Sequence, residues 1–213
     1  DIKIMIGQMI MVGLRGTSPD DAKYFFQPLN GFTIGGVILY DQNVTKSPPS
    51  SHNILSPEQV KDFNEALQSF SPTPLLIGID QEGGQVNRLK ESYGFPPSKS
   101  WAELGRINDI EETQSHSNKM ASTLSDHGFN LNFAPVLDLS VNPDSFIAKK
   151  ERCFSSDPKN IIIHSEILMK AHLDKNVVPV CKHFPGQGSA GGDTHEGIAD
   201  VTETWSETEL IPY

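Results

Sequence analysis

The stretch VVPVCKHFPGQGSAGGDTHEG, residues 177–197, joins a short apolar run to a glycine-rich polar loop. The run is apolar without alternation, which is typical of a strand covered on both faces of a parallel sheet. A cation and an imidazole, Lys182 and His183, follow where this strand should end. The loop then presents Asp193 and His195 two residues apart. The stretch therefore predicts a parallel strand whose carboxyl end carries groups suited to acid–base chemistry.

Four other apolar runs have the same character as this one. With it, they predict strands at residues 10–14, 36–40, 75–80, 131–138 and 177–184. The segment 45–53 is rich in serine and proline, and we expect it to be a surface loop.

Three helices are expected between the later strands. The first follows Ser56, which forms a capping box with Gln59 and precedes a proline at the first helical position. The second begins near Asp109 and stops at Gly128, and the third starts at Asp157. Strands that alternate with helices of this length indicate βαβ units and a parallel sheet, so the fold class is α/β.

Polar residues stand where several of these strands end. Asp80 closes one apolar run, Asp138 closes the next, and Lys182 with His183 closes the last. In a parallel sheet all carboxyl ends lie on one side, so we expect these groups to converge on one crevice or barrel mouth.

Composition excludes several classes of function. The chain has 213 residues, 37% of them hydrophobic, and a net charge of −10 without any basic stripe, which argues against a nucleic-acid partner. Cys153 and Cys181 lack metal-site spacing and are expected to be two free thiols. No apolar run reaches the roughly 18 residues that a membrane-spanning helix needs.

The glycine-rich loop allows more than one interpretation. GQGSAG at 186–191 fits the dinucleotide fingerprint, but the residues after it are a poor helix start, which argues against nucleotide binding. His183, Asp193 and His195 could hold zinc or iron, although Lys182 would place a positive charge beside the metal. The loop could also be a plain surface loop.

Acid–base chemistry explains the loop best. A carboxylate such as Asp193 that accepts the proton of one imidazole nitrogen raises the basicity of the other, so His195 could donate a proton in one step and accept one in the next. Hydrogen bonds to a ligand rich in hydroxyls would come from Asp80, Arg88, Arg152, Lys182 and His183. On spacing alone, the two arginines could equally be surface ion-pair residues.

With these residues in view, the chain resembles the NagZ-type β-N-acetylglucosaminidase (β-hexosaminidase) branch of glycoside hydrolase family 3. The resemblance covers nearly the whole chain. It rests on five blocks in the family's order, IGQMIMVG, GIDQEGGQVNRL, LNFAPVLDLSVNP, ERCFSSDP and KHFPGQGSAGGDTH.

The resemblance implies a (β/α)8 barrel of the TIM type and retaining hydrolysis of terminal β-linked N-acetylglucosamine, as in cell-wall muropeptides, through a covalent glycosyl-enzyme. It implies that His195 is the general acid/base and Asp193 its partner. It assigns contacts with the sugar to Asp80, Arg88, Arg152, Lys182 and His183. It implies no metal and no cofactor.

Three departures from the family pattern stand out. Gln187 occupies a position where the family often has a second His, and Ser189-Ala190 replaces the usual Asp-Thr. The family's nucleophilic Asp lies in a block on the following strand, and residues 1–213 contain no such block. About five βα units are present where a barrel has eight. We therefore expect residues 1–213 to be the N-terminal part of a single barrel domain, whose missing strands and nucleophile belong to the rest of the polypeptide.

Two other functions remain open at this point. One is a phosphorylase of β-N-acetylglucosaminides on the same scaffold, and the other is a non-catalytic sugar-binding fragment. The chain begins without an initiator Met or a signal peptide. Its opening looks more like that of exported family members, which leaves the compartment undecided between the cytoplasm and an exported location.

Overall fold

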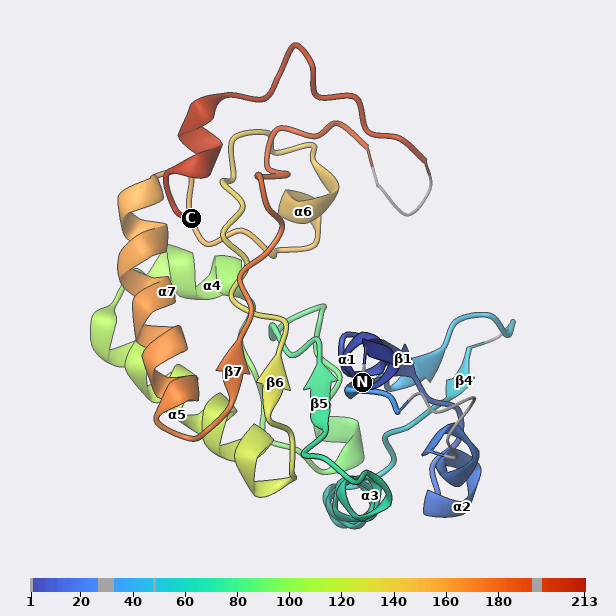
Figure 1. The fold of residues 1–213 in the computed structure, drawn as a ribbon. Coiled ribbons are helices and arrows are strands. Elements are labelled where there is room, and N and C mark those ends of the chain that lie inside the picture. Colours follow the sequence, from blue (N-terminus) through green and yellow to red (C-terminus); the bar gives the residue numbers. More distant parts are fainter. Residues whose placement is uncertain (1, 27–32, 48, 193–196) are drawn as a thin grey trace. The chain divides into compact units, whose positions relative to one another are not determined.

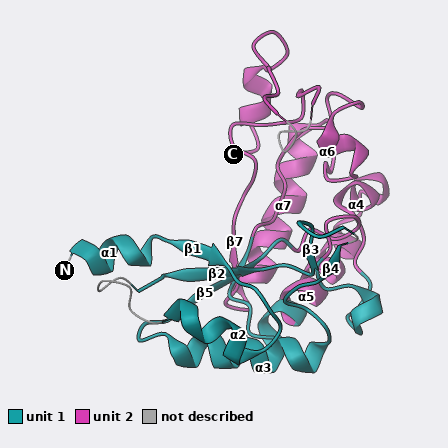
Figure 2. Cartoon of the chain, turned by 90° about the vertical axis from the view of Figure 1, so that its right-hand side faces the viewer, with its two compact units in different colours: residues 1–80, 88–97, 123–132 teal, residues 81–87, 98–122, 133–213 magenta. Residues whose placement is uncertain are grey.

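The computed structural model describes residues 2–26, 33–47, 49–192 and 197–213. The chain forms two compact units (Figure 2). Unit 1 consists of residues 1–80, 88–97 and 123–132, and unit 2 consists of residues 81–87, 98–122 and 133–213.

Unit 1 is built on four parallel strands. Along the sheet they lie in the order β1 (Met11–Gly13), β2 (Gly36–Leu39), β5 (Leu76–Ile79) and β6 (Leu131–Asn132). Val37 in β2 lies opposite Val12 on one side and Ile77 on the other. The parallel sheet that the apolar runs predicted is therefore confirmed, and the order of these four strands in it follows the chain.

The helices of unit 1 include one that was predicted and several short elements that were not. The short ones are α1 (Ile2–Gln8), α2 (Pro19–Ala22) and the 3-10 turns Lys23–Phe26 and Glu91–Tyr93. The predicted helix is α3 (Pro57–Phe70), and it buries Val60, Phe63 and Leu67.

The amino-terminal cap of α3 differs from the predicted capping box. Ser56 Oγ accepts the backbone N–H of Gln59 at 3.2 Å, as expected. The side chain of Gln59 accepts the N–H of Leu55 at 2.9 Å instead of that of Ser56. Only one of the two hydrogen bonds of the capping box therefore forms, because the Gln59 side-chain oxygen accepts from Leu55, the residue before the cap.

The expected surface loop at 45–53 contains a strand, which corrects the prediction. β3 (Gln42–Asn43) and β4 (Ser50–Ser51) pair in an antiparallel hairpin. Two-residue strands are too short to show an alternation of apolar and polar residues, so they could not be predicted from the pattern.

Unit 2 holds most of the helical residues around a compact core. Its helices are α4 (Trp101–Ile107), most of α5 (Ile110–Asp126), α6 (Phe146–Lys149) and α7 (Pro158–Leu173), followed by the 3-10 turn η3 (Glu207–Leu210). The predicted caps are present. Asp109 Oδ1 accepts the N–H of Glu112 at 2.8 Å, and Asp157 Oδ1 accepts that of Lys159 at 2.9 Å.

Strand β7 (Val178–Pro179) leads to the polar end of unit 2. The chain around it runs parallel to the segment that follows β6. Val180 N donates to Ala134 O at 3.0 Å, and Leu137 N donates to Lys182 O at 2.7 Å. This pairing places the residues after both segments side by side.

The regular parts of β6 and β7 are shorter than the predicted ranges 131–138 and 177–184. Pro135 and Pro179 lie inside these ranges, and proline has no N–H to donate to a ladder. Beyond the regular strands, the two segments are still joined in parallel by single hydrogen bonds. The predicted strand direction was therefore right, and the predicted strands were too long.

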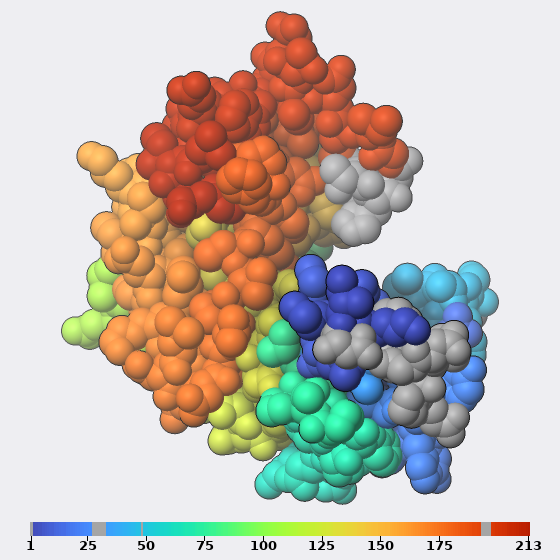
Figure 3. All heavy atoms as spheres, in the orientation of Figure 1, coloured from blue at the N-terminus to red at the C-terminus, as the bar shows by residue number. Residues whose placement is uncertain are grey.

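Two aromatic side chains pack within the mostly aliphatic core of unit 2. Trp101 and Phe154 pack with ring centroids 4.9 Å apart, and Trp101 Nε1 donates to Val136 O at 3.0 Å. Helix α7 packs against β7 (Figure 1). The C-terminal residues, red in Figure 3, cover part of the orange segments, and Tyr213 meets Phe184 edge-on with centroids 5.5 Å apart.

Cys153 and Cys181 are both free thiols, as predicted. None of the helices in the described ranges has the length and apolar character that a membrane crossing requires.

Two histidines of unit 2, the buried His172 and the half-buried His116, should make its stability depend on pH. Burial lowers the pKa of both His116 and His172 to about 4. The unfolded chain binds these protons near pH 6.5, so it holds more protons than the folded chain between about pH 6.5 and 4. We expect the free energy of unfolding, measured with urea, to fall steadily as the pH drops through this window.

A His172→Asn variant tests the assignment of this pH dependence. His172 Nδ1 lies 2.8 Å from Leu168 O, and the Asn amide can donate the same bond without titrating. Each unit of pKa difference corresponds to about 1.4 kcal/mol, so the variant should lose distinctly less stability between pH 7 and 4. An unchanged slope would contradict the role given to His172.

Candidate functional site

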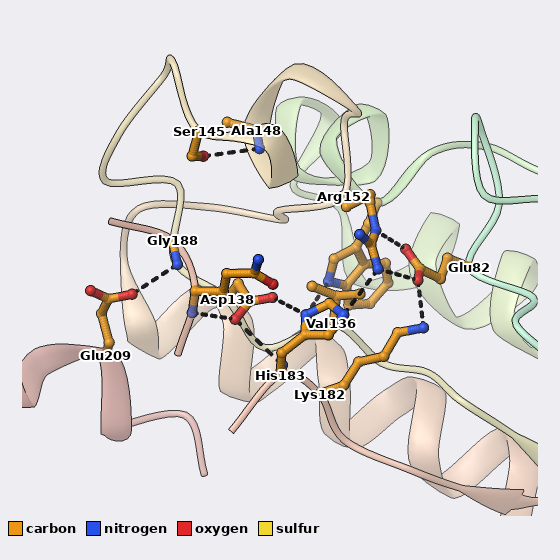
Figure 4. Close-up of polar contacts among 12 residues, drawn as sticks. Glu82, Val136, Asp138, Ser145, Ala148, Arg152, Lys182, His183, Gly188 and Glu209 are labelled. Atoms are coloured by element: carbon orange, nitrogen blue, oxygen red, sulfur yellow. Dashed lines mark hydrogen bonds and ion pairs between the residues drawn. The ribbon is translucent and has the colours of Figure 1, made fainter. Parts of the chain in front are cut away.

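A network of charged side chains gathers in unit 2 at the end of the β7 segment (Figure 4). Lys182 and His183 follow β7, Asp138 follows the segment paired with it, and Arg152 comes after α6. Glu82 joins them from the turn that begins unit 2. The parallel pairing of the two segments brings Asp138 beside Lys182 and His183. Glu82 and Arg152, which are distant in the sequence, join through ion pairs.

A tight turn holds Glu82 in place. Glu82 N and Gly83 N both donate to Val86 O, at 2.9 and 3.1 Å. Gly83 has a φ of +96°, and a Cβ there would lie 2.1 Å from Lys99 O. Only glycine fits at this position, which explains one of the two glycines directly after Glu82.

The Glu82 carboxylate binds two cations at once. Its two oxygens accept Nε and Nη2 of Arg152, each at 2.8 Å, in a bidentate pair, and Oε1 also lies 2.6 Å from Lys182 Nζ. The Glu82 side chain is only 3% exposed, that of Arg152 10% and that of Lys182 14%. Arg152 is thus part of a buried ion pair, and the alternative of a surface ion pair is wrong.

The His183 ring lies between a carboxylate and the Arg152 guanidinium. His183 Nδ1 is 2.5 Å from Asp138 Oδ2, and Nε2 is 3.0 Å from Arg152 Nη2. Asp138 is completely buried. A continuous set of polar contacts therefore runs from Asp138 through His183 and Arg152 to Glu82 and Lys182.

The turn after His183 is held by two buried carboxylates. Asp138 Oδ1 accepts the N–H of Gln187 at 2.8 Å. Glu209, from η3, accepts those of Gly188 at 2.9 Å and Ser189 at 3.3 Å. Successive backbone N–H groups of this kind form a concave anion site, and here the chain's own carboxylates occupy it.

Burial keeps two further groups of unit 2 in their neutral forms. It raises the pKa of the Cys153 thiol far above its ordinary value, and the negative charge of Asp138 adds to this effect. It also raises the pKa of the Tyr213 phenol. Because the reactive form of cysteine is the thiolate, the raised pKa makes the Cys153 thiol a poor nucleophile.

A second polar group lies in unit 1. Arg88 Nη1 is 3.5 Å from Asp41 Oδ1, Lys90 bonds the other oxygen of Asp41, and the Arg88 guanidinium lies 5.8 Å from the centre of the Tyr40 ring. Burial raises the pKa of the Tyr40 phenol. The negative charge of Asp80 raises it further, and the Arg88 cation opposes the shift. The charges of Asp80 and Arg88 are therefore both felt at the Tyr40 hydroxyl, with opposite effects on its pKa.

The predicted site residues fall into three groups. Arg152, Lys182 and His183 come together in unit 2. Asp80 and Arg88 belong to unit 1 and act on its Tyr40. The proposed acid/base pair, Asp193 and His195, lies outside the described residues. Convergence of all these groups on one crevice stays a prediction.

Asp138 belongs to the strand-end groups that the sequence predicts to converge, and it does meet His183. The sequence did not single out Glu82, although Glu82 stands just after a predicted strand, and it did not indicate which charge either carboxylate would meet. Glu209 lies in a short polar segment near the end of the chain and gave no signal at all. Within the described ranges, no three His, Cys, Asp or Glu side chains gather as metal ligands would.

Comparison with known proteins agrees with the resemblance seen in the sequence. The model of the glycosyl hydrolase family 3 N terminal domain matches residues 2–213. A beta-hexosaminidase of Thiobacillus denitrificans is 31% identical over 215 residues, which cover 96% of this chain and 55% of that protein. A beta-hexosaminidase of Alkalilimnicola ehrlichii is 33% identical, and the match covers 96% of this chain and 57% of that protein. The chain spans about half the length of these curated relatives.

Solved structures show the same likeness. A family 3 beta-N-acetylglucosaminidase from a Paenibacillus species has a TM-score of 0.84 and 29% identity, over 100% of this chain and 39% of that one. NagZ from Neisseria gonorrhoeae in complex with N-trifluoroacetyl-D-glucosamine has a TM-score of 0.74 and 26% identity, over 89% of this chain and 53% of that one.

Proposed function

The chain belongs to glycosyl hydrolase family 3, and from this premise we propose that it is the N-terminal part of a single (β/α)8 barrel that removes terminal β-linked N-acetylglucosamine from glycans. The observation that carries the proposal is the set of linked contacts in which Glu82 binds Arg152 and Lys182, and Arg152 also contacts the half-buried His183. Relatives named beta-hexosaminidase support the reaction. A neighbour solved with an N-acylated glucosamine supports the type of sugar.

The charge of the unit 2 network suits an uncharged sugar. Glu82 and Asp138 carry two negative charges, and Arg152 and Lys182 carry two positive charges, so the network is balanced when His183 is neutral. Guanidinium and ammonium groups are donors only and match the oxygen acceptors of sugar hydroxyls. A phosphate ion would find no excess positive charge here, which favours hydrolysis over phosphorolysis.

The proposed chemistry uses groups on and beyond this chain. His195 protonates the leaving glycosidic oxygen while an Asp carboxylate, expected beyond residue 213, attacks the anomeric carbon and forms a glycosyl-enzyme. His195 then takes a proton from the water that releases the sugar with retention. Asp193 orients the imidazole and raises its basicity. In unit 1, Asp80 and Arg88 are proposed as further contacts with the sugar.

Assays on the full-length protein test this function. We expect it to release p-nitrophenol from p-nitrophenyl β-N-acetylglucosaminide, to give free N-acetylglucosamine first as the β-anomer in NMR spectra, and to act far less on the matching β-glucoside. Formation of N-acetylglucosamine 1-phosphate when phosphate is added would establish the phosphorylase instead. Binding of N-acetylglucosamine without turnover would establish a sugar-binding protein.

The 213-residue chain alone provides a separate test. We expect a purified chain with an intact mass near 23.4 kDa to be inactive on the aryl substrate, because the nucleophile lies outside it. Full hydrolase activity at that mass would overturn the assignment of the nucleophile.

A further inference from the structure

Asp138 is the most enclosed member of the unit 2 network. Its side chain has no exposed surface. Its Oδ1 accepts the backbone N–H of Gln187 at 2.8 Å and that of His183 at 3.4 Å, and its Oδ2 faces His183 Nδ1 at 2.5 Å (Figure 4). Oδ1 thus accepts two backbone N–H groups, and Oδ2 faces a ring nitrogen that can carry a proton.

The opposite side of the His183 ring decides where its proton lies. Arg152 Nη2 is 3.0 Å from His183 Nε2. A guanidinium only donates hydrogen bonds, so Nε2 must be the acceptor. A neutral imidazole has one donor and one acceptor, which puts the proton on Nδ1, where Asp138 accepts it.

We propose that Asp138 is a positioning residue, which holds His183 in its Nδ1–H tautomer so that Nε2 receives the Arg152 guanidinium. Glu82 binds one edge of that guanidinium through Nε and Nη2. His183 adds a second contact at Nη2 from another direction. Together they leave the Arg152 side chain one orientation. The effect on catalysis rests on the proposed function, whereas the tautomer does not.

An Asp138→Asn variant reverses this arrangement without changing the size of the side chain. In the variant, the amide oxygen must take the place of Asp138 Oδ1, because the backbone N–H groups of Gln187 and His183 donate to that position. The amide NH2 then faces His183 Nδ1 and can only donate. The ring proton must move to Nε2, where it points at the Arg152 donor. Two donors then face each other, and the contact between His183 and Arg152 is lost.

The experiment combines NMR and kinetics on the full-length protein labelled with 15N-histidine. Long-range 1H–15N correlation spectra distinguish a protonated from an unprotonated ring nitrogen, and a His183→Gln variant identifies the signals. We expect Nδ1 to be protonated in the wild type and Nε2 in Asp138→Asn. We expect kcat/KM for the aryl N-acetylglucosaminide to fall by about 10- to 100-fold in the variant.

Asp144→Asn is the matched control. Asp144 pairs with Lys149 at 3.3 Å and its side chain is 85% exposed, so the same chemical change should alter neither the tautomer nor kcat/KM. If Asp138→Asn does not fold, the wild-type spectrum still tests the proposal. A proton on Nε2 there overturns it.

The remaining outcomes are also decisive. An unchanged His183 tautomer in a folded Asp138→Asn variant overturns the proposal, and a reversed tautomer with undiminished kcat/KM overturns the catalytic part of it. A reversed tautomer in a protein whose wild type hydrolyses no N-acetylglucosaminide supports the positioning role. The proposed function would then be the part that fails.

Discussion

Replacing Glu82 by Gln should lower the free energy of unfolding by about 3–5 kcal/mol, because it leaves two buried cations without their counterion. The Glu82 carboxylate accepts Nε and Nη2 of Arg152 at 2.8 Å and lies 2.6 Å from Lys182 Nζ. All three side chains are mostly or wholly buried. Gln preserves the shape but supplies only a neutral acceptor. Urea unfolding of the two proteins measures the difference.

The same substitution should impair the proposed reaction. Without the carboxylate, the Arg152 and Lys182 cations repel each other and move from the positions in which they would bind the sugar. We expect kcat/KM for p-nitrophenyl β-N-acetylglucosaminide to fall by about 100-fold in the full-length protein, which corresponds to roughly 2.7 kcal/mol. A rise in KM should account for a large part of this, since the affected groups bind the sugar.

A second Glu–Arg pair in unit 2 gives the control for Glu82. Glu151 lies 3.3 Å from Arg106 Nη1, and the two side chains are 43% and 63% exposed. Glu151→Gln makes the same chemical change at the surface, so it should cost less than about 1 kcal/mol and leave kcat/KM unaltered. Equal losses of stability in the two variants would show that the Glu82 network has no special energetic role.

Replacing His195 by Ala should reduce kcat by about 10²–10⁴-fold, the usual contribution of a general acid/base. The loss should depend on the leaving group. A dinitrophenyl leaving group departs without protonation, so formation of the glycosyl-enzyme should be largely preserved for that substrate. Its hydrolysis still needs the base. A burst of dinitrophenol followed by a slow steady state, measured by stopped flow, is the expected signature.

Two additions sharpen the His195 experiment. Azide attacks the glycosyl-enzyme without a general base, so it should restore turnover of the dinitrophenyl substrate in His195→Ala and yield the β-glycosyl azide. His127→Gln is the control, because His127 belongs to unit 1, where its Nδ1 contacts Thr123 O at 2.6 Å, and has no place in the proposed reaction. Undiminished kcat in His195→Ala would refute the acid/base assignment.

Local patterns were sufficient to predict much of the fold. The apolar runs located β1, β2 and β5 within a residue or two, and the caps at Ser56, Asp109 and Asp157 located three helices. Such features depend on neighbours within a few residues, so a sequence displays them directly. The hairpin of β3 and β4 escaped notice because its strands are too short to show any period.

The candidate site was predicted only in part. Lys182 and His183 were recognisable because they directly follow an apolar run, and Arg152 because it lies in a family block. The structure placed these three together and added Glu82 and Asp138 as their partners. Asp193 and His195 stay predictions, as does the convergence of Asp80 and Arg88 with the others.

The sequence by itself determined which elements form and which chemical groups stand at the ends of the strands, since caps, apolar periodicity and strand-end polarity are local properties. Only the tertiary structure decided which charges meet. Glu82 and Arg152 are 70 residues apart, and Asp138 and His183 are 45 apart. Parallel pairing brings the segments around Asp138 and His183 side by side, and burial then requires every charge to find a partner. That requirement selected Glu82 for two cations and Asp138 for one imidazole.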